Sequence, residues 1–293
     1  MRRHKNKTIH FVAKEAIRIS EVLSRYFKVE KETLETLLSI GAIYLNKHRQ
    51  LTDQKIDKGE HLQVYLEPKR YPVAGIDWKQ TILSHEKEFL VINKPVGVPV
   101  HSTEDNLIEN VLYQLRKFYG EELWVTHRLD TTVSGVMVLA KNQRFQAEFN
   151  QILSQRKISK IYRALVEHKP KPGIVKHFMS PEEKSPRKLS LEPQEGWLEC
   201  LLEIIEVKPW ISFEGKEFWD LEIKLHTGRT HQIRAQLSKV GSAILGDKMY
   251  RGRNRAGFTT RRLALHATKL DWSHGGRNYM FYSEPNFIQY LNS

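Results

Sequence analysis

Asp130 is the residue in this sequence whose surroundings most favour a chemical role. It lies in the stretch His127–Gly135, between a basic pair and a threonine-rich turn, directly before a run of apolar residues. A carboxylate at the mouth of a buried strand lies where a ligand can reach it. The same residue type in a turn commonly serves only to accept hydrogen bonds from the local backbone. The stretch alone therefore leaves two interpretations open, a catalytic acid or a structural cap.

Two basic clusters could hold a polyanion near this acid. The segment Lys248–Arg262 carries six basic residues and no acidic one, and its Tyr250 and Phe258 could stack on bases. Four more basic residues lie within residues 156–163. Over the whole chain, 47 Lys and Arg outnumber 34 Asp and Glu, which gives a net charge of +13. A chain this basic predicts a polyanionic partner, with nucleic acid as the first candidate, although a basic balance can also serve solubility alone.

Several enzyme classes are excluded by what the sequence lacks. Cys200 is the only cysteine, so neither an internal disulfide nor a CxxC zinc site can form, and the HxE and PCxxC signature of nucleobase deaminases is missing. Neither a glycine-rich nucleotide loop nor a Walker loop is found. No apolar run approaches the roughly 20 residues that span a bilayer, and the N-terminus lacks the apolar stretch of a secretory signal. We therefore expect no metal, no membrane association and a cytoplasmic location.

The pattern from residue 15 to residue 68 predicts two helices followed by short strands. Val22 and Leu23 lie at helical spacing, and Gly41 follows the second helical run as a glycine that ends a helix. The alternating run Ala42–Leu45 predicts a strand that turns at residues 46–47, and a second alternating run covers His61–Leu66. Prolines at positions 68 and 72 bracket a linker.

From about residue 83 the pattern changes to that of a mixed α/β domain. We expect a helix that contains Leu107, Val111 and Leu115, with Asp105 or Asn106 as its N-cap. A helix capped by Asn142 and a helix over Thr230–Val240, with Ile233, Leu237 and Val240 facing inward, are also predicted. Arg234 falls on the face of that last helix away from Ile233 and Leu237. The predicted strands cover residues 89–92, 135–141, 160–167, 198–206, 218–225 and 263–270.

The stretch HRLDTTVSGVMVLAK resembles the signature of the RluA family of pseudouridine synthases, with Val133 where the family usually has threonine. Further segments resemble the family's motifs in the expected order: Ile92–Gly97 with Val100 and His101, Lys160–Tyr162, Thr227–Arg234 followed by Ile244–Asp247, and Leu263–Ala267. The resemblance covers about residues 83–274, and several ordered motifs are far more specific than any one of them.

The resemblance implies a catalytic site with three members. Asp130 would be the nucleophile, Arg234 the partner that favours its anion, and Tyr162 an aromatic that stacks on uracil and whose hydroxyl could handle the proton leaving carbon 5. Arg128 would stack in the hole left by the extruded base, and His127 would support the turn or contact RNA. Contacts with RNA or with the base pocket are also predicted for a further set, whose last three members lie in the basic segment Lys248–Arg262: Leu265, Arg229, His231, Arg251, Arg253 and Arg255.

Each of these residues also has a simpler interpretation. Arg234 could contact phosphate or be a solvated helix charge, and Arg128 could form a local salt bridge. Tyr162 could be an ordinary strand tyrosine, Leu265 a core residue and His127 a structural histidine.

The chemistry that the resemblance implies needs no cofactor. Pseudouridine forms when uracil leaves its ribose, turns and rejoins through carbon 5, so no electrons are exchanged and no outside group is added. A carboxylate can act as the nucleophile, as in retaining glycosidases, although the atom that it attacks is not evident from the sequence. The uridine must first be extruded from its stack.

The N-terminal part resembles the small RNA-binding domain named after a small-subunit ribosomal protein, the S-four domain. The match lies in Arg18-Ile19, in the stretch LLSIGAIYLN and in the turn Lys58–Glu60. Ser20 stands where that family usually has aspartate, and Glu30-Lys31 where it has a serine-arginine pair. The second predicted helix is also acidic, which puts the RNA-binding strength of this module in doubt.

We therefore expect four segments: a basic arm (1–14), an S-four-like domain (15–68), a linker (69–82) and a catalytic domain (83–293). The fold class is α+β, with a mixed, largely antiparallel sheet in the catalytic domain. The predicted function is that of a monomeric RNA pseudouridine synthase. Ribosomal RNA is the first candidate for its substrate, and tRNA is the second. The alternative is a non-catalytic RNA-binding or ribosome-assembly factor with the same fold.

Overall fold

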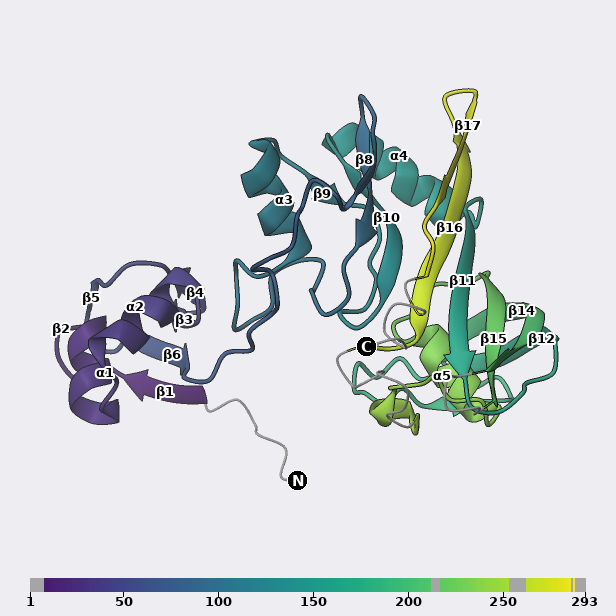
Figure 1. The fold of residues 1–293 in the computed structure, drawn as a ribbon. Helices are drawn as coiled ribbons and strands as arrows, with labels where there is room; N and C mark the ends of the chain where they lie inside the picture. Colours follow the sequence, from purple (N-terminus) through teal and green to yellow (C-terminus); the bar gives the residue numbers. More distant parts are fainter. Residues whose placement is uncertain (1–7, 212–216, 253–261, 286, 288–293) are drawn as a thin grey trace. The chain divides into compact units, whose positions relative to one another are not determined.

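The computed structural model describes residues 8–211, 217–252, 262–285 and 287. The chain divides into two compact units. The N-terminal unit comprises Met1–Ile76 and His101–Gly120, and the large unit comprises Asp77–Val100 and Glu121–Ser293. Figure 1 shows the elements of both. No helix among the described residues is both long enough and apolar enough to cross a membrane.

The N-terminal unit is a small α+β module. Its main sheet has the strand order β1-β6-β3-β4 with antiparallel neighbours, and the short strands β2 and β5 pair separately. The elements are β1 (Thr8–Val12), β2 (Ile17–Arg18), α1 (Ile19–Phe27), α2 (Lys31–Ser39), β3 (Ile43–Leu45), β4 (His48–Gln50), β5 (Lys55–Ile56), β6 (His61–Tyr65) and α3 (Val111–Tyr119).

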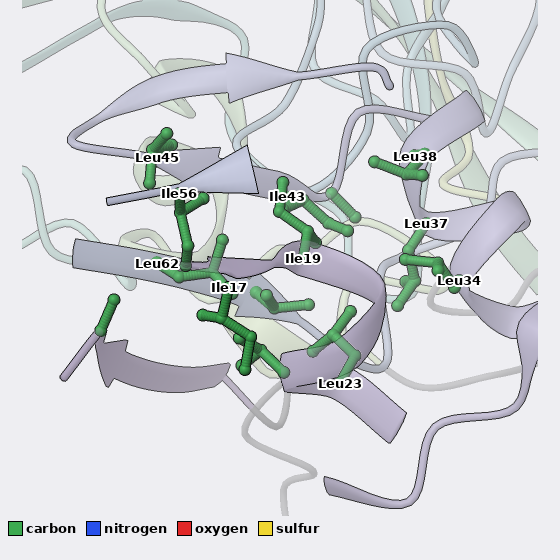
Figure 2. Close-up of a cluster of buried hydrophobic side chains, with 14 of the residues drawn as sticks. Ile17, Ile19, Leu23, Leu34, Leu37, Leu38, Ile43, Leu45, Ile56 and Leu62 are labelled. Carbon is green, nitrogen blue, oxygen red and sulfur yellow. The ribbon is translucent and has the colours of Figure 1, made fainter. Parts of the chain in front are cut away.

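One hydrophobic cluster holds the helices α1 and α2 to the strands of this unit (Figure 2). Val22 and Leu23 of α1 are buried in it, as their helical spacing predicts. The first turn of α1 has no cap from its own N-terminal residue; instead, the Asp53 carboxylate accepts hydrogen bonds from the Ser20 amide (3.0 Å) and hydroxyl (2.8 Å). Gly41 follows α2 with a left-handed φ of +70°, which confirms the predicted end of that helix.

Residues 101–120 belong to the N-terminal unit, so the observed division differs from the expected boundary at residue 83. Hydrogen bonds explain the difference. Leu107 N–H donates to the Ile40 carbonyl (2.7 Å), the Lys69 amide donates to Asp105 (2.8 Å), and Arg70 pairs with Glu109 at 2.6 Å. Lys69 and Arg70, in the segment expected as a linker, are thus bonded to Asp105 and Glu109 of the same unit.

Local side-chain hydrogen bonds explain why the predicted start of helix α3 is wrong. The helix begins at Val111, and its N-cap is Asn110, whose side chain accepts from the Tyr113 amide (2.9 Å). Asn106 instead accepts from the amides of Ile108 (3.2 Å) and Glu109 (3.0 Å) in a local turn before the helix.

The large unit contains one mixed, largely antiparallel sheet, which confirms the predicted fold class. Its strand order is β13-β12-β14-β15-β11-β16-β10-β8-β7, with β17 paired to β16 and β9 to β10. Among the described strand pairs only β10 and β16 run parallel. The strands are β7 (Ile82–His85), β8 (Phe89–Lys94), β9 (Trp124–Val125), β10 (Ser134–Ala140), β11 (Ser159–Val166), β12 (Gly173–Met179), β13 (Leu189–Ser190), β14 (Leu198–Ile211), β15 (Glu217–Leu225), β16 (Leu265–His274) and β17 (Arg277–Tyr282).

Two helices and one 3₁₀ turn accompany this sheet: α4 (Gln143–Ser154), α5 (Gln232–Lys239) and η1 (Lys248–Tyr250). The Asn142 side chain caps α4 by accepting from the Phe145 amide (2.8 Å), as predicted. Ile233 and Leu237 of α5 are buried, but the prediction that Val240 faces inward is wrong, because the helix ends at Lys239 and Val240 is 42% exposed.

Helix α5 also buries its polar side, which includes Arg234. All six residues from Gln232 to Leu237 are buried. Gln236 donates to the Val175 carbonyl (2.9 Å), and Gln232 donates to Gln236 (2.9 Å). Hydrogen bonds inside the protein therefore replace water on that side of the helix.

Strands β10 and β16 meet side by side at Ser134↔His266 and Gly135↔Ala267. Gly135 has a φ of +120°, and a Cβ there would overlap the Ala267 carbonyl oxygen. Glycine is required for so close an approach of two backbones. This contact fixes the start of β10, and with it the loop that carries Asp130.

A candidate active site around Asp130

Asp130 lies in the loop between β9 and β10, and its apolar neighbours anchor it. Leu129 and Val133 are buried, whereas the Asp130 side chain keeps 24% of its surface exposed. The Thr131 carbonyl accepts from the Gly97 amide (2.8 Å), and the Asp130 carbonyl accepts from the Val133 amide (3.0 Å). The alternation of apolar and polar residues in this loop thus presents a carboxylate at the surface on a fixed backbone.

Arg234 of α5 connects Asp130 to a second carboxylate. Its Nη1 donates to Asp130 Oδ2 (2.9 Å), while its Nε and Nη2 donate to Asp247 (2.7 and 3.0 Å). Burial opposes the guanidinium charge, but Asp247 and then Asp130 outweigh it and raise the pKa of Arg234. Because the buried Asp247 binds Nε and Nη2 of the guanidinium, the third nitrogen, Nη1, is held in a fixed direction toward Asp130.

Tyr162 of β11 is buried near the same carboxylate. Burial, and then the negative charge of Asp130, raise the pKa of its hydroxyl. The phenol therefore stays protonated at neutral pH. Its strand register places Tyr162 opposite Ala267, and Ala267 in turn lies opposite Gly135 of β10. Leu265, also buried, lies opposite Ala164 on the same pair of strands.

Lys94 is a member of the site that the sequence analysis did not single out. The side chain, at the end of β8, is fully buried and donates to the carbonyls of Pro95 (2.8 Å) and Thr131 (3.5 Å). Burial lowers its pKa to about 7, and the charge of Asp130 opposes that shift. Lys94 thus ties the turn after β8 to the residue that follows Asp130.

His231 lies at the N-terminal end of α5 and faces Asp130. Its Nε2 is 3.7 Å from Asp130 Oδ2, and its Nδ1 is 3.2 Å from the hydroxyl of Tyr250. The Arg234 guanidinium also lies over the ring of Tyr250, 5.2 Å from the ring centroid, in a cation–π contact. Burial is the main cause of a lowered His231 pKa. The structure thus brings together Asp130, Tyr162, Arg234 and His231, three of which were predicted to be catalytic.

His127 and Arg128 precede Asp130 but have different surroundings. The His127 Nε2 accepts from the Val138 amide (3.2 Å), and its ring stacks on Phe149 at 6.1 Å. Burial, together with the charge of Lys160, lowers the pKa of His127 to about 3, so the ring is neutral. These contacts favour the structural interpretation of His127. The Arg128 side chain is exposed.

The remaining residues predicted to contact RNA lie at the surface or outside the described part of the chain. Arg229 and Arg251 are exposed, on the turn before α5 and just after η1. Arg253 and Arg255 lie outside the described residues, as does Phe258.

His266 connects three segments near the site. Its Nε2 is 3.1 Å from the Ser283 carbonyl, which can only accept, so Nε2 carries the proton and Nδ1 accepts from the Ser134 hydroxyl (2.8 Å). Burial lowers the pKa of His266 to about 4. The neutral ring thus joins the start of β10 to β16 and to the residues after β17.

Acid should destabilise the protein through these neutral histidines. The folded-state pKa of His266 and that of His127 lie below the ordinary value of 6.5, so between about pH 6.5 and 4 the unfolded chain binds protons that the folded chain does not. The free energy of unfolding should fall by about 1.4 kcal/mol per pH unit for each histidine once the pH is well below 6.5. Urea unfolding at pH 7, 6 and 5 measures this. In His266→Gln the slope of the free energy of unfolding against pH should be smaller by the contribution of one proton, about 1.4 kcal/mol per pH unit. An unchanged slope would contradict the neutral ring.

The sequence and the fold are similar to those of known proteins. Residues 88–239 match the family model described as RNA pseudouridylate synthase. The chain is 31% identical over 287 residues to "Ribosomal large subunit pseudouridine synthase C" of Buchnera aphidicola, an alignment that covers 88% of this chain and 86% of that protein. It is 32% identical over 217 residues to "RNA pseudouridine synthase 6, chloroplastic" of Oryza sativa, covering 68% of this chain but only 46% of that relative.

A solved structure, "Human RNA Pseudouridylate Synthase Domain Containing 4", has the same fold. The TM-score is 0.60 at 23% identity, and the match covers 73% of this chain and 94% of that one. Family model, relatives and fold thus agree on the part of the chain that carries Asp130 and Arg234. The chain belongs to the RNA pseudouridylate synthase family.

Proposed function

We propose that this protein is an RNA pseudouridine synthase with Asp130 as its nucleophile. One observation carries the proposal: a partly exposed carboxylate is held by a guanidinium whose other edge is locked on the buried Asp247. A fixed cation aims the carboxylate without reorganisation at the moment of reaction. The chain spans about half the length of the chloroplastic relatives that it matches.

The reaction proceeds without loss or gain of atoms. The bond between N1 of uracil and the ribose breaks, the base turns within the site, and a bond from C5 to the ribose forms while the C5 proton leaves and N1 gains one. Asp130 supplies the electron pair of the nucleophile. The Tyr162 ring packs against the base, and its protonated hydroxyl acts as a hydrogen-bond donor before it can take part in any proton transfer. Arg128 occupies the gap in the RNA stack.

The substrate we propose is structured RNA. Ribosomal RNA is the first candidate, and tRNA is the second. The relative from Buchnera aphidicola that aligns with most of this chain is named for the large ribosomal subunit. The net charge of +13 and the exposed Arg229 and Arg251 provide contacts for phosphates. We further propose that the N-terminal unit is an S-four-like RNA-binding module, that the large unit is the catalytic domain, and that the protein acts as a monomer without cofactor.

Tritium release tests the activity directly. RNA transcribed with uridine labelled at carbon 5 loses its label to water when C5 becomes bonded to ribose. The purified protein should release tritium from ribosomal RNA fragments in a buffer that contains EDTA. Binding of the same RNA without release, at every fragment tried, would favour the alternative of a non-catalytic RNA-binding or assembly factor.

A further inference from the structure

The two side chains that hold Asp130 contact the same carboxylate oxygen. Arg234 Nη1 lies 2.9 Å from Oδ2 and His231 Nε2 lies 3.7 Å from Oδ2. Because both contacts involve Oδ2, neither of these two side chains occupies the other oxygen, Oδ1.

The proton on His231 can be placed from its neighbours. The Tyr250 hydroxyl accepts from the Arg187 amide (2.8 Å), which leaves its own hydrogen for His231 Nδ1 at 3.2 Å. The Ser185 hydroxyl lies 3.4 Å from the same Nδ1. An ionised carboxylate can only accept, so the nitrogen that faces it must carry the hydrogen. A neutral imidazole with its proton on Nε2 satisfies both sides of the ring, and the pKa of His231, lowered mainly by burial, favours the neutral form.

The backbone at His231 serves this orientation. The residue has a left-handed φ of 59° directly before α5, a conformation that costs most residues energy and that Asn, Asp and His adopt more readily. Charged groups surround the ring on both sides: Asp130 and Asp247 are negative, Arg234 and Arg187 positive. The neutral ring points an N–H at Asp130 without adding a further charge to these four groups.

We propose that His231 is a positioning residue for the nucleophile. Its Nε2–H, directed by the Tyr250 hydroxyl, shares Oδ2 of Asp130 with Arg234 and thereby presents Oδ1 to the substrate. The 3.7 Å separation is longer than a hydrogen bond, and the proposed role requires it to shorten to about 3 Å when RNA is bound. This role rests on the proposed function and replaces the RNA contact predicted for His231 from the sequence.

Two conservative variants separate this role from a merely structural one. In His231→Gln the amide nitrogen reaches approximately the place of Nε2, so a donor to Oδ2 is kept. In His231→Asn the shorter amide reaches only the place of Nδ1, so that donor is lost, although asparagine suits the left-handed backbone better than glutamine does. A structural role predicts that Asn is the better substitute, and the positioning role predicts Gln.

The expected result in the tritium-release assay is a change in kcat rather than in KM. His231→Asn should lower kcat by roughly 10- to 100-fold with KM nearly unchanged, because a hydrogen bond to a charged group is lost. His231→Gln should recover most of that loss. Tyr250→Phe keeps the ring beneath Arg234 and removes only the hydroxyl; it should lower kcat in the wild type but add little in the His231→Asn background.

Three outcomes would overturn the proposal. A higher KM with unchanged kcat would make His231 an RNA contact. Equal loss in Gln and Asn, or a better Asn, would make its role structural. Additive effects of Tyr250→Phe and His231→Asn would disconnect the two residues. Failure of the wild-type protein to release tritium would instead refute the proposed function, so the two failures are distinguishable.

Discussion

Replacing Asp130 by asparagine is expected to abolish tritium release, with kcat lowered by roughly 10⁴-fold or more, while RNA binding persists. The amide has the size of the carboxylate but supplies no anionic oxygen for attack. The fold should survive, because Leu129 and Val133 anchor the loop and Arg234 keeps its two bonds to Asp247. The measurements are single-turnover tritium release and RNA binding by filter retention for the same preparation.

A matched control comes from a carboxylate outside the site. Asp271 of β16 is partly exposed and pairs at the surface with Lys269 at 3.5 Å. Asp271→Asn should leave the rate of release within about twofold of wild type, since exposed pairs of this kind contribute little. If Asp130→Asn released tritium at a rate close to that of this control, another group would have to be the nucleophile.

The sequence predicted the elements whose apolar residues alternate or recur at helical spacing. Strand β10, a continuous apolar run that is buried from Gly135 to Ala140, and helix α4 with its Asn142 cap follow the prediction closely. Strands β12 and β17 were not predicted. Both are half exposed, with polar residues at positions that alternate irregularly with the apolar ones, so their pairing comes from the neighbouring strands β14 and β16 rather than from a local signal.

The sequence did not indicate which polar side chains of the site are buried. A pattern of hydrophobicity places Arg234 and Lys94 in solvent, yet both are buried because carboxylates or carbonyls receive their hydrogen bonds. Some of these partners are distant in sequence: Asp247 is 13 residues from Arg234, and Thr131 is 37 residues from Lys94. The signal that could have found Lys94 is its place at the end of the apolar run Phe89–Ile92, directly before Pro95.

Removing the charge of Arg234 is the second change with a large expected effect. Arg234→Gln leaves Asp247, 1% exposed, without its ion-pair partner, and the free energy of unfolding should drop by roughly 3–5 kcal/mol, as for other broken buried pairs. The rate of tritium release should also fall, by roughly 10²- to 10³-fold, because Asp130 loses the cation that stabilises and aims it. Urea unfolding and single-turnover release measure the two effects in the same sample.

A double variant separates those two effects. Arg234→Gln combined with Asp247→Asn removes both buried charges and leaves two amides that can hydrogen bond to each other, so most of the lost stability should return. Activity should not return, since Asp130 still lacks its guanidinium. Recovery of both stability and tritium release would mean that Arg234 acts only by holding α5 to the η1 turn. Recovery of stability alone would assign Arg234 to the chemistry, because a correctly folded site would then contain every predicted group except the cation beside its nucleophile.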